Sequence, residues 1–300
     1  MAQVNPVVGD IEGNAALIKK AVSESLASSV DVIVFPEMVL TGYPVEDLAL
    51  RPAFRRASID RITTLAKEIA DLGAGQILTL VGYLDEKDKP QNALALIHGG
   101  EVKATYIKHH LPNYGVFDEF RNFGPGKGTL VARFRGVDIA VAICEDIWQD
   151  QGPMAELAKR TPGIVLVPNG SPYERKKDDV RLSLVQRRVV QIGAPMIYVN
   201  MTGAQDDLVF DGDSLAVGVD RELLARAEQF ASSLTIVDVP VIEKSSTPDI
   251  VIDETPLSDL PRHTTVIAER LSDEEEVRTC GGSSKTWSTS TWTWTRSKTS

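Results

Sequence analysis

Short apolar runs alternate with amphipathic segments along most of the chain. Continuous apolar runs that end in turn-forming residues predict strands buried on both faces. We predict such strands over residues 31–35, 76–84, 92–100, 101–108, 129–134, 137–143, 163–171, 195–200, 214–220 and 234–240. Apolar positions that recur near the 3.6-residue period predict helices over residues 14–29, 54–73, 153–160 and 178–193.

These strands are too numerous for one small sheet. Two sheets packed face to face, with the helices on their outer sides, would bury the strands on both faces. The sequence therefore predicts an α/β fold built as a four-layer αββα sandwich.

The two ends of the chain break this pattern. The opening residues MAQVN leave little room for a strand before VVGD, so we expect the first strand to lack part of its length. From Cys280 onward there is neither an apolar period nor an acidic residue. We expect a folded domain over residues 1–277 and an aberrant, disordered tail over residues 278–300. The tail reads as a shifted reading frame, with a natural low-complexity linker as the alternative.

Charge and cysteine content narrow the class of protein. The net charge of −10 argues against nucleic-acid and anionic-membrane partners, which require basic patches. Two cysteines, Cys144 and Cys280, cannot form a disulfide scaffold, and the four histidines show no metal-ligand spacing. No apolar run approaches the ~20 residues of a membrane span, and the N-terminus lacks the pattern of a signal peptide. We expect a cytoplasmic protein without a bound metal.

Candidate chemistry gathers at the ends of three predicted strands. Glu37 follows the first strand, Lys108 ends the strand over 101–108, and Cys144 ends the strand over 137–143. A carboxylate, an ammonium and a thiol form a complete set for acyl transfer: a base, an oxyanion stabiliser and a nucleophile. The pattern predicts that a thiolate attacks an amide carbonyl.

Each of these residues also has a simpler interpretation. Cys144 could be an inert core residue, Glu37 a solvated loop acid and Lys108 a charge at a strand edge. His109 and His110 offer a rival Cys–His pair, which would leave Glu37 and Lys108 without a role. Glu119 lies in the long loop over residues 109–128 and is not counted among the catalytic residues. The segment GPGKGT in the same region lacks the spacing of a phosphate-binding loop.

The motifs around these residues resemble a known family. PE after the first strand, K before a proline-containing loop and C-x-D-x-W after a strand resemble the Glu–Lys–Cys signature of the nitrilase, or carbon–nitrogen hydrolase, superfamily. The segments QVNPVVGDIEGN, PEMVLTGYPVEDL, KHHLPNYGVFDEFR, ICEDIW and NGSPYERKKDD are similar to the glutaminase domain of glutamine-dependent NAD synthetases. The resemblance runs from residue 2 to about residue 277.

The resemblance implies roles for further residues and for partners. It implies that Tyr114, Ser171 and Lys177 bind the substrate glutamine, and that the chain forms a homo-oligomer. The glutaminase part would need no cofactor, because ATP and Mg would belong to a synthetase domain that nothing in this sequence matches. A free-standing amidase acting on another small amide, and an inactive remnant that only associates with subunits, are the alternatives.

Overall fold

The structure is a computed structural model that describes residues 1–175, 177–243 and 251–257. The side chains of residues 177–179 and 251 are outside this description. The predicted tail over residues 278–300 and the predicted domain boundary at 277 also lie outside the described residues. The described residues belong to the compact unit Met1–Leu260.

The first sheet has the strand order β2-β3-β4-β5. Its strands are β2 (Val32–Val34), β3 (Leu78–Glu86), β4 (Pro90–His98) and β5 (Glu101–Ile107). Strands β2 and β3 are parallel, whereas β3, β4 and β5 pair antiparallel. Strands β4 and β5 form a hairpin whose turn contains Gly99 and Gly100, and both glycines take the positive φ that such tight turns require.

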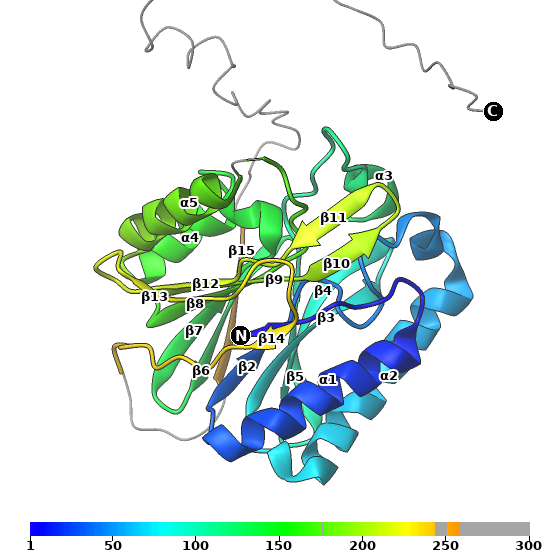
Figure 1. Ribbon diagram of the computed structural model, residues 1–300, viewed down its shortest axis with the longest axis horizontal. Helices are drawn as coiled ribbons and strands as arrows, with labels where there is room; N and C mark the ends of the chain where they lie inside the picture. The colour runs from blue at the N-terminus through cyan, green and yellow to red at the C-terminus, as the bar shows by residue number, and fades with distance from the viewer. Residues whose placement is uncertain (176, 244–250, 258–300) are drawn as a thin grey trace, which may run out of the picture. The chain divides into compact units, whose positions relative to one another are not determined.

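The outer face of this sheet is covered by α1 (Ile11–Ser25) and α2 (Pro52–Ile69), as Figure 1 shows. Ile18 and Leu65 from these helices share one apolar cluster with Val81 of the sheet. Helix α1 begins three residues before the prediction, because the Asp10 side chain accepts a hydrogen bond from the Gly13 amide at 2.9 Å and caps the helix. Short helical turns occur at η1 (Leu26–Ser28), η2 (Glu46–Leu50) and η3 (Ala70–Ala74).

The second sheet has the strand order β13-β12-β9-β8-β7-β6-β15. Its strands are β6 (Gly128–Phe134), β7 (Val137–Val141), β8 (Ile164–Asn169), β9 (Met196–Asn200), β12 (Leu215–Val217), β13 (Leu223–Arg226) and β15 (Val251–Pro256). Strands β7, β8 and β9 run parallel, so their carboxyl ends lie at one edge. Helices α4 (Pro153–Arg160) and α5 (Lys177–Ile192) cover the outer face.

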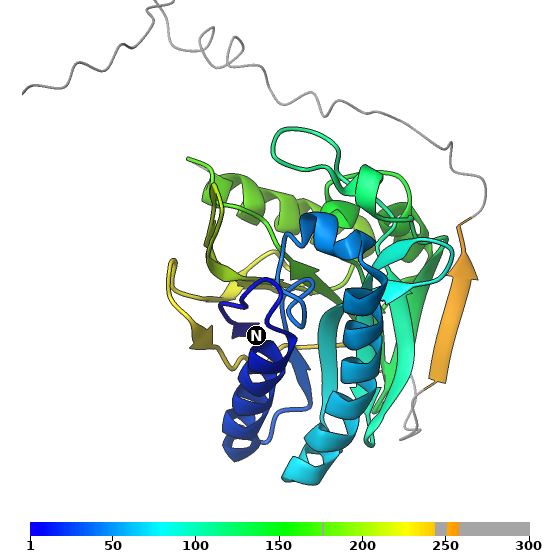
Figure 2. The ribbon, with the colours of Figure 1, turned by 90° about the vertical axis from the view of Figure 1, so that its right-hand side faces the viewer.

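The two sheets pack against each other through a shared apolar cluster. Leu80 and Leu94 of the first sheet meet Val141, Leu166 and Ile197 of the second in this cluster. Figure 2 shows the two sheets side by side, with α1 and α2 outside one of them. In the described residues the layers therefore follow the order αββα, which confirms the predicted α/β fold.

Several elements differ from the prediction. Of the strand predicted over 234–240, only β14 (Ser233–Leu234) forms, and it pairs with β1 (Ala2–Gln3). The predicted loop over 109–128 contains a short helix, α3 (Glu119–Asn122). A hairpin of β10 (Thr202–Gln205) and β11 (Leu208–Asp211) was not predicted, since its polar residues hide the strand period. Of the helices in the described part of the chain, none combines the length and apolar character that crossing a membrane requires.

Candidate active site

Glu37 lies just beyond the end of β2 and is buried, with 1% of its surface exposed. Its Oε2 accepts a hydrogen bond from the Gly170 amide at 2.8 Å. Its Oε1 accepts from Asn92 Nδ2 at 2.7 Å and from the Lys108 ammonium at 2.6 Å. The carboxylate is thus held by β4, by the end of β5 and by the loop after β8. The solvated loop acid considered as an alternative is ruled out.

Gly82 of β3 allows this placement. A Cβ at Gly82 would lie 2.2 Å from the Met38 amide nitrogen and 2.7 Å from the Pro36 carbonyl oxygen. The backbone around Glu37 therefore packs directly onto β3, and a side chain at position 82 would push it away. A sequence pattern cannot reveal this contact, because it joins residues that are far apart along the chain.

Lys108 follows β5 and has no exposed surface. Its Nζ lies 2.6 Å from Glu37 Oε1 and 2.9 Å from Glu119 Oε2. Burial by itself disfavours the charged ammonium, but the carboxylates of Glu119 and Glu37 outweigh it and raise the pKa of Lys108 well above its usual value. Lys108 is therefore a fixed positive charge between two carboxylates, and not a charge at a strand edge.

Glu119 begins α3 and is the residue that sequence reasoning left out of the site. It is buried, and its Oε1 accepts a hydrogen bond from the Tyr43 hydroxyl at 2.8 Å. Burial raises the pKa of Glu119 to about 7, although the nearby Lys108 lowers it. Its place in the long loop gave a weak signal, because many acids occur in loops and only the fold brings this one to Lys108.

Cys144 opens the short turn η4 (Cys144–Ile147) directly after β7. The residue has a φ of 41°, in the left-handed region that non-glycine residues seldom occupy, and only 6% of it is exposed. Such strained positions cluster at functional sites. Burial and the Glu37 carboxylate raise the pKa of the thiol, while Lys108 lowers it. The cysteine thus holds its proton at neutral pH and lies within electrostatic reach of both other candidates.

Asp146 braces the turn that carries Cys144. Its Oδ2 accepts from the Ile143 amide at 3.0 Å and from the Tyr106 hydroxyl at 2.8 Å. Its Oδ1 accepts from the amides of His109 and His110 at 3.2 and 2.8 Å. The carboxylate thereby ties the end of β7 to the segment that follows Lys108.

The two histidines have contacts of a structural kind. The His109 ring Nδ1 lies 2.7 Å from the Gly126 carbonyl oxygen, and the His110 ring Nε2 lies 3.3 Å from that of Gln151. The two rings also pack edge to face. These contacts give the rival Cys–His pair no support.

The three residues expected to bind substrate lie in different settings. The Tyr114 hydroxyl donates to Glu145 Oε2 at 2.7 Å, which places it one residue from Cys144. Ser171 is buried after β8, next to the Gly170 amide that binds Glu37. Lys177 is the first residue of α5, and its side chain lies outside the described atoms.

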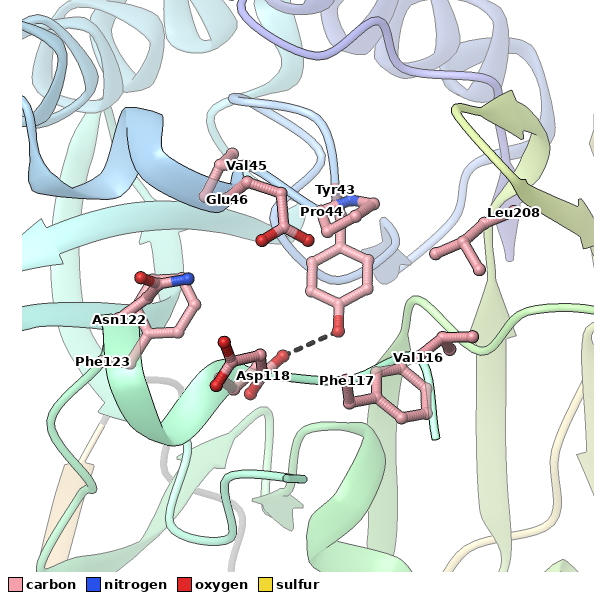
Figure 3. A pocket seen from close by; sticks show the side chains of 11 residues that line it. Tyr43, Pro44, Val45, Glu46, Val116, Phe117, Asp118, Asn122, Phe123 and Leu208 are labelled. Atoms are coloured by element: carbon pink, nitrogen blue, oxygen red, sulfur yellow. Dashed lines mark hydrogen bonds between the residues drawn. The ribbon is translucent and has the colours of Figure 1, made fainter. Parts of the chain in front are cut away.

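A pocket opens beside this group of residues (Figure 3). Tyr43 projects into it, with its hydroxyl pointing toward Glu119. The pocket is lined by Tyr43, Pro44, Val45, Glu46, Val116, Phe117, Asp118, Glu119, Asn122, Phe123 and Leu208. Because Glu119 contacts both the pocket and Lys108, the pocket adjoins the buried charges.

The sequence of the chain is similar to those of known proteins. Residues 1–247 match the family model described as carbon-nitrogen hydrolase. The glutamine-dependent NAD(+) synthetase of Thermotoga maritima is 37% identical over 245 residues, which are 81% of this chain and 42% of that protein. The enzyme of the same name from Rhodobacter capsulatus is 38% identical over 240 residues, 80% of this chain and 43% of that protein. The chain thus spans less than half the length of these relatives.

Solved structures show the same fold. A glutamine-dependent NAD+ synthetase from Acinetobacter baumannii, in complex with ADP, has a TM-score of 0.72 and 32% identity, covering 85% of this chain and 44% of that one. An amidase from Nesterenkonia sp. AN1 has a TM-score of 0.69 and 25% identity, covering 80% of this chain and 91% of that one.

Proposed function

Because the chain belongs to the carbon–nitrogen hydrolase family, we propose that it hydrolyses the side-chain amide of glutamine to glutamate and ammonia. The observation that carries the proposal is the buried Glu37–Lys108 ion pair, within electrostatic reach of the Cys144 thiol. Glutamine is proposed because the relatives described above bear glutamine in their names. Their names also lead us to propose that the released ammonia supplies NAD synthesis.

The first step forms a tetrahedral intermediate, which becomes a thioester when ammonia leaves. Glu37 takes the proton of the Cys144 thiol while the sulfur attacks the amide carbon. Since the raised pKa leaves the thiol protonated, a base is needed during the attack. The Lys108 ammonium and the backbone N–H of Glu145 stabilise the negative charge that develops on the carbonyl oxygen, and each such donor contributes about 3 kcal/mol.

The remaining steps return the enzyme to its starting state. The Glu37 carboxyl group gives its proton to the amide nitrogen, the C–N bond breaks and ammonia leaves. Glu37 then removes a proton from a water molecule, which attacks the thioester carbon. The C–S bond breaks, glutamate leaves, and the sulfur recovers its proton from Glu37. Lys108 keeps its charge throughout, because Glu119 and Glu37 hold its pKa high.

Tyr114, Ser171 and Lys177 are proposed to hold the glutamine. The contact of Tyr114 with Glu145, one residue from the nucleophile, supports this role. The position of Ser171 next to Gly170, which binds Glu37, supports it as well. We propose that these steps use only side chains, the Glu145 backbone N–H and water, without a cofactor. The homo-oligomer and the cytoplasmic location expected from the sequence stay predictions.

Ammonia release from glutamine tests the proposal. We expect Cys144→Ala to reduce the rate by at least about 10³-fold, because the nucleophile is lost. A matched control, Ser183→Ala on the exposed side of α5, should leave the rate within twofold, since this residue lies outside the site. Release of ammonia at the wild-type rate by Cys144→Ala would contradict the assignment.

A second candidate function is hydrolysis of another small amide. The structural similarity to the Nesterenkonia amidase, with a TM-score of 0.69 at 25% identity, supports it. Comparing kcat/KM for glutamine and for propionamide decides between the two. A clear preference for propionamide would replace the glutaminase by an amidase with the same catalytic residues.

A further inference from the structure

Helix α5 carries two buried arginines on one face, at positions 181 and 188. Seven residues are about two turns of an α-helix, so both side chains leave the helix in the same direction. Arg181 has no exposed surface and Arg188 is 1% exposed. Burying a guanidinium is unfavourable unless its hydrogen bonds are supplied by the protein. The partners of these two groups therefore indicate their purpose.

Arg181 holds the loop that follows β8. Its Nη2 donates to the carbonyl oxygens of Ser171 at 2.9 Å and of Pro172 at 3.0 Å. Its Nη1 binds both carboxylate oxygens of Asp211 at 2.7 and 2.6 Å, which balances its charge. This is the same loop whose Gly170 amide binds Glu37 at 2.8 Å. Arg181 thus contacts Glu37 only indirectly, through the loop that contains Gly170 and Ser171.

Asn200 of β9 also holds this loop, through two hydrogen bonds to the Ser171 backbone. Its side-chain oxygen accepts from the Ser171 amide at 2.9 Å, and its Nδ2 donates to the Ser171 carbonyl oxygen at 3.0 Å. Ser171 is therefore held on both sides of its backbone. The carbonyl oxygen that Asn200 binds is also the one that Arg181 binds.

Arg188 holds the turn that carries the nucleophile. Its Nε donates to the carbonyl oxygen of Ile147, the last residue of η4, at 2.6 Å. Its Nη1 lies 2.8 Å from Asp150 Oδ1, and this carboxylate is 77% exposed. The exposed Asp150 carboxylate thus balances the charge of Arg188. The Nε atom of Arg188 meanwhile fixes the backbone oxygen of Ile147, three residues after Cys144.

We infer that Arg181 and Arg188 are positioning residues, through which α5 sets the nucleophile turn and the Gly170–Ser171 loop relative to each other. The inference rests on the proposed function and extends it. One rigid helix contacts both segments, so the distance between thiol and base depends on the helix and not on either loop alone. An error of about 1 Å in such a distance costs a reaction on the order of 10²-fold in rate.

The test uses Arg181→Met and Arg188→Met, with Val190→Met as the matched control, since Val190 lies on the same helix and is 62% exposed. Each variant is measured for melting temperature, for alkylation of Cys144 by iodoacetamide, and for kcat and KM with glutamine. We expect folded Arg188→Met to lose kcat and alkylation rate by about 10–100-fold with little change in KM. Arg181→Met should also raise KM, because Ser171 moves. Val190→Met should match the wild type.

Conservative variants keep the inference testable if the methionine variants do not fold. Arg181→Lys and Arg188→Lys keep the charge but lose the forked geometry, so we expect partial loss in the same parameters. Asp150→Ala releases Arg188 from the surface and leaves the core intact, and it should slow alkylation to a smaller degree. Unchanged alkylation and unchanged kinetics in the folded variants would overturn the inference.

The outcome also separates this inference from the proposed function. Alkylation does not require glutamine. If wild-type protein releases no ammonia from glutamine but the arginine variants still slow alkylation, the positioning role stands and the glutaminase fails. If glutamine is hydrolysed equally well by wild type and variants, the glutaminase stands and the positioning role fails.

Discussion

At the scale of single residues, the main feature of the candidate site is that several charged groups are buried together. Lys108 lies between Glu37 and Glu119, so one positive charge faces two carboxyl groups, and all three side chains are buried. Such a group is stable only if its net charge is small. The pKa of Glu119, raised to about 7 by burial, shows how this is achieved: Glu119 readily holds a proton that its exposed counterpart would lose.

This raised pKa predicts how stability depends on pH. Between about pH 4.5 and 7 the folded protein keeps a proton on Glu119 that the unfolded chain has lost. The Glu119 contribution to the free energy of unfolding is therefore complete below pH 4.5 and falls as pH rises through 7. Glu119→Gln removes this titration. We expect the stability of wild type relative to Glu119→Gln to fall by on the order of 2–3 kcal/mol between pH 4.5 and 8.

Urea unfolding of both proteins at several pH values from 4.5 to 8 measures this difference. Glu24→Gln, an exposed acid on α1, is the matched control and should follow the wild type at each pH. A constant difference between wild type and Glu119→Gln across this range would contradict the raised pKa.

At the scale of elements, the turn η4 depends on one side chain from within it. Asp146 accepts four hydrogen bonds, from the amides of Ile143, His109 and His110 and from the Tyr106 hydroxyl. A carboxylate is the side chain that can accept this number without offering a donor. The turn and the segment after β5 are therefore fixed together.

Asp146→Asn tests this role. The amide NH₂ group would face buried N–H and O–H donors, which would be left without an acceptor, at about 1–3 kcal/mol each. We expect the free energy of unfolding to fall by about 2–5 kcal/mol, and alkylation of Cys144 to slow. Denaturant unfolding and iodoacetamide labelling measure the two effects. Asp207→Asn, in the exposed β10–β11 turn, should change neither; a stable, fully reactive Asp146→Asn would refute the bracing role.

At the scale of the whole unit, the apolar layer between the sheets supports the site. Leu94 of β4 is fully buried in this layer, two residues beyond Asn92, which binds Glu37. Removing side-chain volume there leaves a cavity that the two sheets cannot close without moving the strand. The stability of the fold and the placement of the base therefore depend on the same strand.

Leu94→Ala is expected to lower the free energy of unfolding by about 2–5 kcal/mol. Leu50→Ala is the control, since Leu50 is 51% exposed and such surface changes stay within about 0.5 kcal/mol. Thermal or urea unfolding measures both. Equal effects of the two substitutions would mean that the layer between the sheets contributes little to stability.

The sequence by itself determined the elements and the identity of the chemical groups. Apolar runs and helical periods are local properties, so the long helices, the αββα layers and most strands of the two large sheets could be predicted from them; β13 and β15 were missed. Glu37, Lys108 and Cys144 were found because each lies at or just beyond the end of a predicted strand. The β10–β11 hairpin was missed because its polar residues hide the strand period, whereas the strand predicted over 234–240 was wrong beyond Leu234.

Only the tertiary structure decided which groups meet. Glu119, Asn92, Arg181 and Arg188 carry no local signal that distinguishes them from ordinary surface residues, and each acquires its role from a contact across the chain. Their protonation follows the same rule, since burial and neighbouring charges are set by packing. Local periodicity depends on residues that are neighbours in the sequence, whereas the electrostatics of a buried site depend on distances that exist only after folding.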